Sequence, residues 1–143
     1  MAITVIDVIA QEPDCCRARV QYRDHELVAL VRGTMDEVRS MIGTPRTVEI
    51  GFSRVTEWKL IPNFSDDDSG IVGTDAGSTS ARIRGRACSK MDVDDRTELI
   101  DIYVQAGPDF VTVDTSEVDT AGISIDDGLE VQVEGLRFYP TGT

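Results

Sequence analysis

Residues 16–32 read CRARVQYRDHELVALVR, and this stretch decides the fold class. Up to residue 23, charged or polar side chains alternate with apolar or small ones. The apolar or small side chains are Cys16, Ala18, Val20 and Tyr22. Alternation with a period of two indicates a strand with one buried face. The apolar pattern resumes at Leu27 after a polar turn at Asp24 and His25, so residues 15–32 are predicted to form a β-hairpin.

A short helix is predicted after this hairpin, over residues 35–42. Thr34 and Glu37 have the spacing of a capping box, in which each side chain bonds a free backbone N–H at the start of the helix. The face expected to be buried carries Met35, Val38 and Ile42. At about two turns, the helix is too short to be stable alone and must pack against a sheet.

Strand patterns recur along the rest of the chain, and turn clusters such as Gly107 with Pro108 separate them. They cover residues 46–52, 80–90, 97–105, 110–115 and 129–139. Residues 62–80 are rich in Asp, Gly and Ser and are predicted to form a long, flexible, exposed loop. The order indicates an all-β fold with one short helix, either a small barrel or a sandwich. At 143 residues the chain is expected to form one domain over 1–143.

The helix position is similar to that of the five-stranded oligonucleotide/oligosaccharide-binding (OB) barrel, which carries a helix after its third strand. This resemblance concerns topology alone, and the strands beyond residue 80 exceed the minimal barrel. It implies an OB-like barrel whose closing strand lies within residues 129–139.

The composition restricts the partners and the compartment. A formal net charge of -12 makes nucleic acid a poor partner for the molecule as a whole. No basic leader or membrane-length apolar run occurs, and the three cysteines are odd in number, so we expect a cytoplasmic protein with reduced thiols. Lys59 and Lys90 are the only lysines among many arginines, a bias typical of a GC-rich bacterial genome.

No catalytic, cofactor or metal site is predicted. His25 is the only histidine, and although Cys15 and Cys16 lie on the partner strand, packing explains them better than catalysis does. The two acidic clusters are Asp66, Asp67 and Asp68 and, further on, Asp92, Asp94 and Asp95. Neither has the glycine and glutamate spacing of a calcium loop.

Two rows of arginines are the candidate anion-binding residues. They hold half of the chain's arginines: Arg17, Arg19 and Arg23 in one row, and Arg82, Arg84 and Arg86 in the other. If the two strands were neighbours, their guanidinium groups would form a face for phosphate or carboxylate. If a strand carrying Glu130 and Glu134 lay beside one row instead, ordinary cross-strand ion pairs would result. The pairing is the favoured interpretation, because neither row has outward aromatic side chains for stacking bases.

We therefore expect a small acidic, non-enzymatic protein that binds another protein with a basic surface, such as an inhibitor or immunity protein of a nucleic-acid-acting partner. The candidate acidic interaction surface consists of the six aspartates at 66–68, 92, 94 and 95. Two alternatives remain open. One is an OB-like domain that binds an anionic ligand or single-stranded nucleic acid at the arginine rows, and the other is a structural subunit of a larger assembly. The pattern leaves the oligomeric state undetermined.

Overall fold

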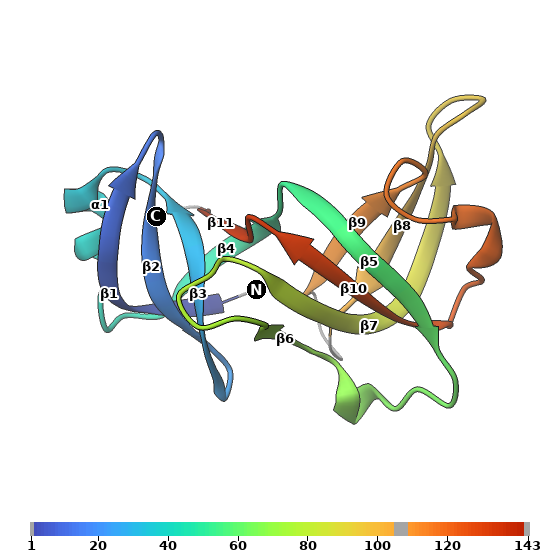
Figure 1. Ribbon diagram of the computed structural model, residues 1–143, viewed down its shortest axis with the longest axis horizontal. Helices are drawn as coiled ribbons and strands as arrows, with labels where there is room; N and C mark the ends of the chain where they lie inside the picture. The colour runs from blue at the N-terminus through green and yellow to red at the C-terminus, as the bar shows by residue number, and fades with distance from the viewer. Residues whose placement is uncertain (1, 105–108, 142–143) are drawn as a thin grey trace. The chain divides into compact units, whose positions relative to one another are not determined.

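The structure is a computed structural model that describes residues 2–104 and 109–141. Its strands and single short α-helix confirm the all-β fold with a closed barrel (Figure 1). The chain divides into two compact units. The barrel unit comprises Met1–Ser53, Val72–Ala81 and Glu134–Thr143, and the sheet unit comprises Arg54–Ile71 and Arg82–Val133. That residues 1–143 behave as one domain stays a prediction.

The barrel unit contains five strands and the α-helix. They are β1 (Ala2–Glu12), β2 (Cys15–Tyr22), β3 (His25–Arg32), α1 (Met35–Arg39), β4 (Arg46–Gly51) and β11 (Arg137–Pro140). The strands form a ring in the order β1-β2-β3-β11-β4, with β4 pairing back onto β1. The pair of β11 with β3 is parallel, whereas the other pairs of the ring are antiparallel. The short strand β11 therefore closes the barrel.

The hairpin predicted over residues 15–32 is confirmed as β2 and β3. Its register places Cys16 opposite Val31 and Tyr22 opposite His25. The turn is formed by Arg23 and Asp24, one residue earlier than predicted, because His25 already belongs to β3. Arg23 has a φ of 55°, in the left-handed region that a two-residue hairpin turn uses.

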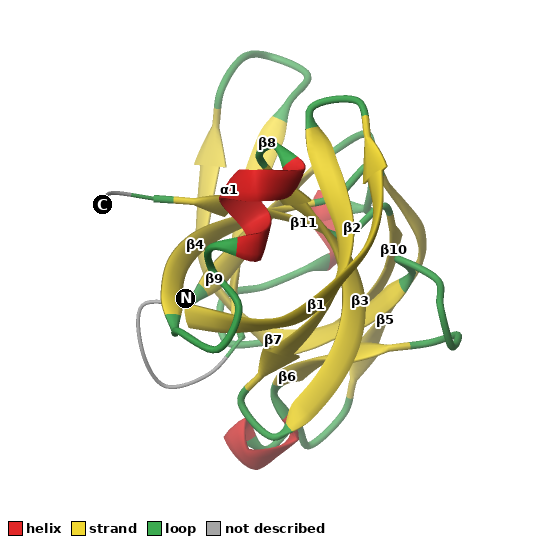
Figure 2. Ribbon diagram, turned by 90° about the vertical axis from the view of Figure 1, so that its left-hand side faces the viewer, coloured by secondary structure: helices red, strands yellow, loops and turns green. Residues whose placement is uncertain are grey.

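The predicted capping box of α1 is present. The backbone N–H of Glu37 donates to Thr34 Oγ1, and the N–H of Thr34 donates to Glu37 Oε1. The helix ends at Arg39, however, and not at residue 42. After Arg39 the backbone N–H groups of Met41 and Ile42 donate to carbonyls three residues back instead of four, and Met41 is buried together with Val38, whereas Ile42 is 43% exposed. The prediction that Ile42 lies on the buried face was therefore wrong. α1 lies against β1 and β2 (Figure 2).

The barrel core consists of the inward face of each strand. The four side chains predicted to face inward from β2 are buried, and Tyr22 and Phe138 are the largest of the fully buried side chains here. Other members of this core are Ile3, Val5, Leu27, Ala29, Val31, Val38 and Val48. Burial of apolar area, at about 25 cal/mol per Å², is the main stabilising contribution of such a core.

Six strands and two 3-10 helices lie wholly or partly in the sheet unit. They are β5 (Arg54–Ile61), η1 (Asp66–Asp68), β6 (Gly70–Gly73), β7 (Ala81–Asp92), β8 (Glu98–Tyr103), β9 (Phe110–Asp114), η2 (Thr120–Gly122) and β10 (Gly128–Glu134). The sheet order is β5-β10-β7-β8-β9, and β6 pairs with β7 off this path. β7, β8 and β9 correspond to the strands predicted at 80–90, 97–105 and 110–115. The predicted turn at Gly107 and Pro108 lies outside the described residues.

Two sequence predictions differ from the structure in this part of the chain. Residues 62–80 contain η1 and β6, and Ile71 within β6 is 1% exposed, so the segment is not one long loop. The strand predicted at 129–139 is two strands, β10 and β11. Gly135 adopts a φ of 69° between them, a left-handed conformation that interrupts the strand geometry. None of the helices in the described residues has the length and apolar character needed to cross a membrane.

Gly85 in the centre of β7 allows the neighbouring strand to approach closely. A Cβ at this position would collide with the backbone carbonyl of Tyr103 on β8. We predict that Gly85→Ala lowers the free energy of unfolding by about 1–3 kcal/mol, because the two strands must move apart. Gly70→Ala in β6 is the matched control, since a Cβ there has open space. Urea unfolding of both variants measures the difference, and equal stabilities would contradict the proposed close approach.

Candidate functional site

The arginines of β2 are bound by carboxylates of their own unit. Arg17 Nε lies 2.9 Å from Glu12 Oε2. Arg19 forms a bidentate pair with Asp7, with its Nε 3.0 Å from Oδ1 and its Nη2 2.9 Å from Oδ2. Its Nη1 lies 3.1 Å from Glu26 Oε1. The hydrogen bonds from Arg19 hold the pKa of Asp7 below its ordinary value. The guanidinium of Arg19 is therefore shared by two carboxylates.

Arg23 stands at the end of the same row but in the hairpin turn. Its guanidinium carbon lies 5.2 Å from the centre of the Tyr22 ring, a cation–π distance. The second row, on β7, belongs to the sheet unit. The six arginines thus divide between two units, with different acids beside each row.

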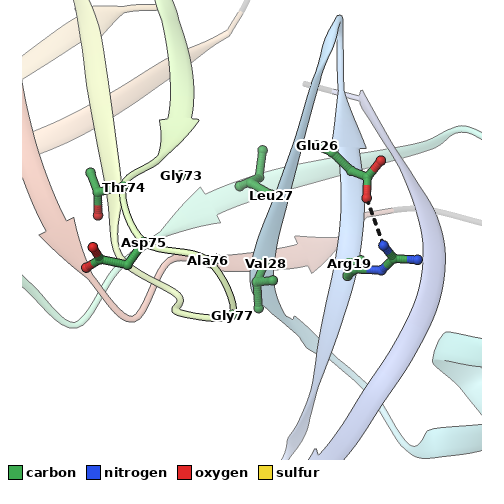
Figure 3. A pocket seen from close by; sticks show the side chains of 9 residues that line it. All are labelled: Arg19, Glu26, Leu27, Val28, Gly73, Thr74, Asp75, Ala76 and Gly77. Carbon is green, nitrogen blue, oxygen red and sulfur yellow. Dashed lines mark hydrogen bonds and ion pairs between the residues drawn. The ribbon is translucent and has the colours of Figure 1, made fainter.

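A hollow beside residues 26–28 of β3 is the candidate site of the barrel unit (Figure 3). It has a volume of about 170 Å³ and is lined by Arg19, Glu26, Leu27, Val28 and residues 73–77. The 73–77 segment comes close to β3, because a Cβ added to Gly73 would lie 3.4 Å from Leu27 Cβ. Asp75 also lines the hollow, but its carboxylate is directed away from Arg19 and Glu26 in Figure 3. Arg19 is outnumbered by its own two carboxylate partners, Asp7 and Glu26.

In the sheet unit, Glu130 on β10 is the shared partner of the second row. Its side chain is 6% exposed, and its Oε1 accepts a 2.7 Å hydrogen bond from Arg84 Nε. Arg82 Nε lies 3.4 Å from the same oxygen, an ion-pair distance without hydrogen-bond geometry. Lys59 Nζ lies 3.6 Å from Oε2. Burial alone would raise the pKa of Glu130. The hydrogen bond from Arg84 and the positive charges of Arg84, Lys59 and Arg82 outweigh burial, so the pKa of Glu130 lies below its ordinary value.

Arg86, the third member of that row, is bound in a different way. Its Nε lies 3.0 Å from Asp66 Oδ1, and its two terminal nitrogens donate to the backbone carbonyls of Asp126 and Phe64. Its guanidinium also lies 5.3 Å from the centre of the Phe64 ring. Arg86 therefore connects the η1 segment to β7 as a structural contact.

The favoured interpretation of the β7 row, pairing with a strand that carries Glu130, matches the observed neighbours. Lys59, Arg82 and Arg84 are all within ion-pair distance of Glu130, however, and its one negative charge does not balance their positive charges. The hollow beside it has a volume of about 200 Å³ and is lined by Glu57, Trp58, Lys59, Arg82, Arg84, Glu130 and Gln132. Three cations against two carboxylates leave one net positive charge in this hollow. The sequence reasoning did not single out Trp58 and Lys59, because their position beside β7 depends on long-range strand pairing.

The two acidic clusters lie at opposite ends of the sheet unit. The first is η1, in yellow-green in Figure 1, and the second is the tip of the β7–β8 hairpin. All six aspartates are exposed. Asp66 is paired with Arg86, and Asp94 Oδ1 accepts from the backbone N–H groups of Arg96 and Thr97. The clusters therefore form two separate acidic patches.

The cysteines and the histidine do not form a nucleophile and base. Cys16 lies opposite Val31, whereas His25 lies opposite Tyr22, six residues further along β2, which is about 20 Å. Burial raises the pKa of the Cys15 and Cys16 thiols, which favours the unreactive thiol form. In residues 2–104 and 109–141, no group of three or more His, Cys, Asp or Glu side chains gathers where it could hold a metal ion. Nothing in this part of the chain positively indicates catalysis.

A third and larger hollow, of about 690 Å³, lies between α1, β3, β4 and β11. Its lining is mostly polar and includes Arg32 and Arg46 together with Asp14 and Glu37. Sequence analysis missed both arginines because neither belongs to an alternating row. Glu37 is already used in the capping box of α1.

Comparison of this chain with protein-family models, curated proteins and solved structures found no match.

Removing the charge of Glu130 tests how the β7 row is stabilised. We predict that Glu130→Gln lowers the free energy of unfolding by about 2 kcal/mol at pH 7, because three cations lose their shared counter-charge. Since the folded-state pKa of Glu130 is depressed, its contribution is complete above the ordinary pKa of 4.5 and is lost as pH falls through the folded-state value. The loss in the variant should therefore disappear in acid.

The matched control is Glu26→Gln, whose side chain is 56% exposed and whose ion pair should contribute less than about 1 kcal/mol. Denaturant unfolding at a series of pH values measures both variants. A pH-independent loss in Glu130→Gln would show that its charge is not what stabilises the row.

Proposed function

We propose that the barrel is of the OB type. The strand order β1-β2-β3-β11-β4, the parallel pairing of β3 with β11 and the helix between β3 and β4 support this assignment. OB barrels bind ligands on the face of their second and third strands and on loops that include the connection from the fourth to the fifth strand. Here the hollow of β2 and β3 is lined by residues 73–77, which lie in the connection from β4 to β11. This hollow is the proposed binding site.

The proposed ligand of this site is a basic segment of another protein, and the protein acts by binding rather than by catalysis. The observation that carries the proposal is the double engagement of Arg19 by Asp7 and Glu26. A guanidinium bound by two carboxylates has no free pair of N–H donors for an incoming phosphate. Arg19, Asp7 and Glu26 together carry a net negative charge. A lysine or arginine side chain complements such a surface.

The size of the hollow favours a protein partner over a small molecule. Its 170 Å³ is below the range of about 300–1,000 Å³ that small-molecule sites occupy. It would hold about five or six waters, at about 30 Å³ each, and so one or two side chains. The net charge of -12 would steer a cationic partner toward the molecule.

An inhibitor or immunity protein for a basic nucleic-acid-acting partner has these properties. Its carboxylates would occupy positions that the partner uses for phosphates. The proposal includes a reducing compartment such as the bacterial cytoplasm, which suits the three free cysteines.

A cationic and an anionic probe test whether the barrel hollow prefers a basic ligand. We predict that a fluorescent ten-residue Lys/Arg peptide binds the wild type with an affinity that falls as salt rises, and that it binds more tightly than a thymidine oligonucleotide of equal length. The double variant Asp7→Asn, Glu26→Gln should weaken peptide binding about tenfold and strengthen oligonucleotide binding, because it frees the Arg19 fork.

Glu49→Gln with Asp36→Asn makes the same change in net charge at exposed positions of the barrel unit that do not line the hollow, and it serves as the control. Fluorescence anisotropy at two salt concentrations measures all three proteins. If the control variant loses as much peptide affinity as the hollow variant, the peptide binds the general negative field and the site is wrong.

The hollow beside Glu130 supports a second candidate, which is binding of an anionic ligand or single-stranded nucleic acid in the sheet unit. The supporting observation is the net positive charge that Lys59, Arg82 and Arg84 leave there against Glu57 and Glu130.

Trp58 is the only tryptophan, and its chain neighbours Glu57 and Lys59 line this hollow, so its fluorescence reports changes in β5 beside the hollow. We predict that phosphate or a thymidine oligonucleotide changes Trp58 emission in low salt and that Arg84→Gln removes the response. Arg17→Gln, in the barrel unit, should leave the response unchanged. Equal responses of both variants would refute this second candidate.

A further inference from the structure

Strand β5 is at the edge of its sheet, with β10 as its only strand neighbour among the described residues. Its other edge presents backbone N–H and C=O groups that a further strand could pair with. The side chains of β5 are largely accessible, with Lys59 63% and Leu60 43% exposed. An accessible edge strand is a binding surface for another extended segment.

The sequence of β5, RVTEWKLI, is complementary to itself in an antiparallel arrangement. If Trp58 faces Trp58 of a second copy, then Glu57 faces Lys59 of that copy, and Val55 faces Ile61. Val55, Glu57, Lys59 and Ile61 share one face of the strand, because side chains alternate. That face would then consist of two opposite-charge pairs flanked by two apolar pairs. On the other face, Thr56 would pair with Leu60.

Neighbouring registers lack this match. Moving the pairing by one residue in either direction places a charged side chain of residue 57 or 59 opposite an apolar or neutral one. Centring it on Glu57 or on Lys59 places two like charges opposite each other, which destabilises a sheet. One register is therefore strongly preferred, as a specific two-fold interface requires.

We propose that the protein forms a symmetric dimer by antiparallel pairing of β5 with β5 of a second copy, centred on Trp58. This inference goes beyond the proposed barrel site, since it involves neither the barrel hollow nor a cationic partner, and it uses residues of β5 that also line the hollow beside Glu130. A lysine on an edge strand ordinarily prevents sheets from joining. Here Glu57 of the second copy would form an ion pair with Lys59. The ion pair of Lys59 with Glu130, at 3.6 Å, is long and solvent-exposed on the lysine side, so it leaves Lys59 available.

Charge reversal with mixing tests both the dimer and its register. Sedimentation velocity over a range of concentrations should show a monomer–dimer equilibrium for the wild type. Glu57→Lys alone, and Lys59→Glu alone, should each weaken dimerisation at least about tenfold, because two attractive pairs become repulsive. An equimolar mixture of the two variants should recover dimer formation, since residues 57 and 59 of one variant again face residues of opposite charge on the other.

Two further variants separate pairing from folding. Lys59→Gln removes the attraction without placing a second acid beside Glu130, so it should weaken the dimer while keeping the wild-type circular dichroism spectrum. Glu49→Lys, in the barrel unit, makes the same charge change as Glu57→Lys and should dimerise like the wild type. Emission of Trp58 should shift on dilution of the wild type and not of Glu57→Lys. A wild type that remains monomeric at every concentration, or a mixture that stays monomeric, would overturn the proposal.

Discussion

The whole chain depends on the closure of the barrel by β11, which must fit between β3 and β4 and bond to both. The polypeptide therefore has to leave the barrel after β4 and return to the same opening. Two backbone hydrogen bonds fix the ends of this excursion, from Ser53 N–H to the carbonyl of Glu134 and from Leu30 N–H to the carbonyl of Leu136, at 2.8 and 2.9 Å. The sheet unit is thus built entirely from the connection between two barrel strands.

Carboxylates supplied by neighbouring strands decide what the arginines do. β1 supplies Asp7 and Glu12 to the arginines of β2, and β10 supplies Glu130 to those of β7. The same residue type therefore has different surroundings in the two units. Arg19 is outnumbered by acids on an exposed face, whereas Glu130 is outnumbered by cations and is itself buried. This contrast supports the proposal of a cationic ligand for one hollow and of an anionic ligand for the other.

Local patterns predicted most of the elements, and long-range pairing accounts for what they missed. Period-two alternation identified β2, β3 and β7, and the Thr34 capping box identified the start of α1, because these signals lie within a few residues. The end of α1 and the break at Gly135 depend on backbone conformations that no periodicity encodes. Alternation likewise placed the arginines on outward faces, but it contains no information on which strand lies alongside. The roles of Asp7, Lys59 and Trp58 therefore became visible only with the strand order.

Closure by β11 also has a consequence for synthesis on the ribosome. Arg137 follows Gly51 by 86 positions. At translation rates of about 5–20 residues per second, the first four barrel strands would wait about 4–17 seconds before their last neighbour is made. During that interval β3 and β4 have no partner on one edge, and the apolar side chains around Phe138 lack their final cover. The open barrel therefore exposes an unpaired strand edge for several seconds during synthesis, which is a site that a chaperone could cover.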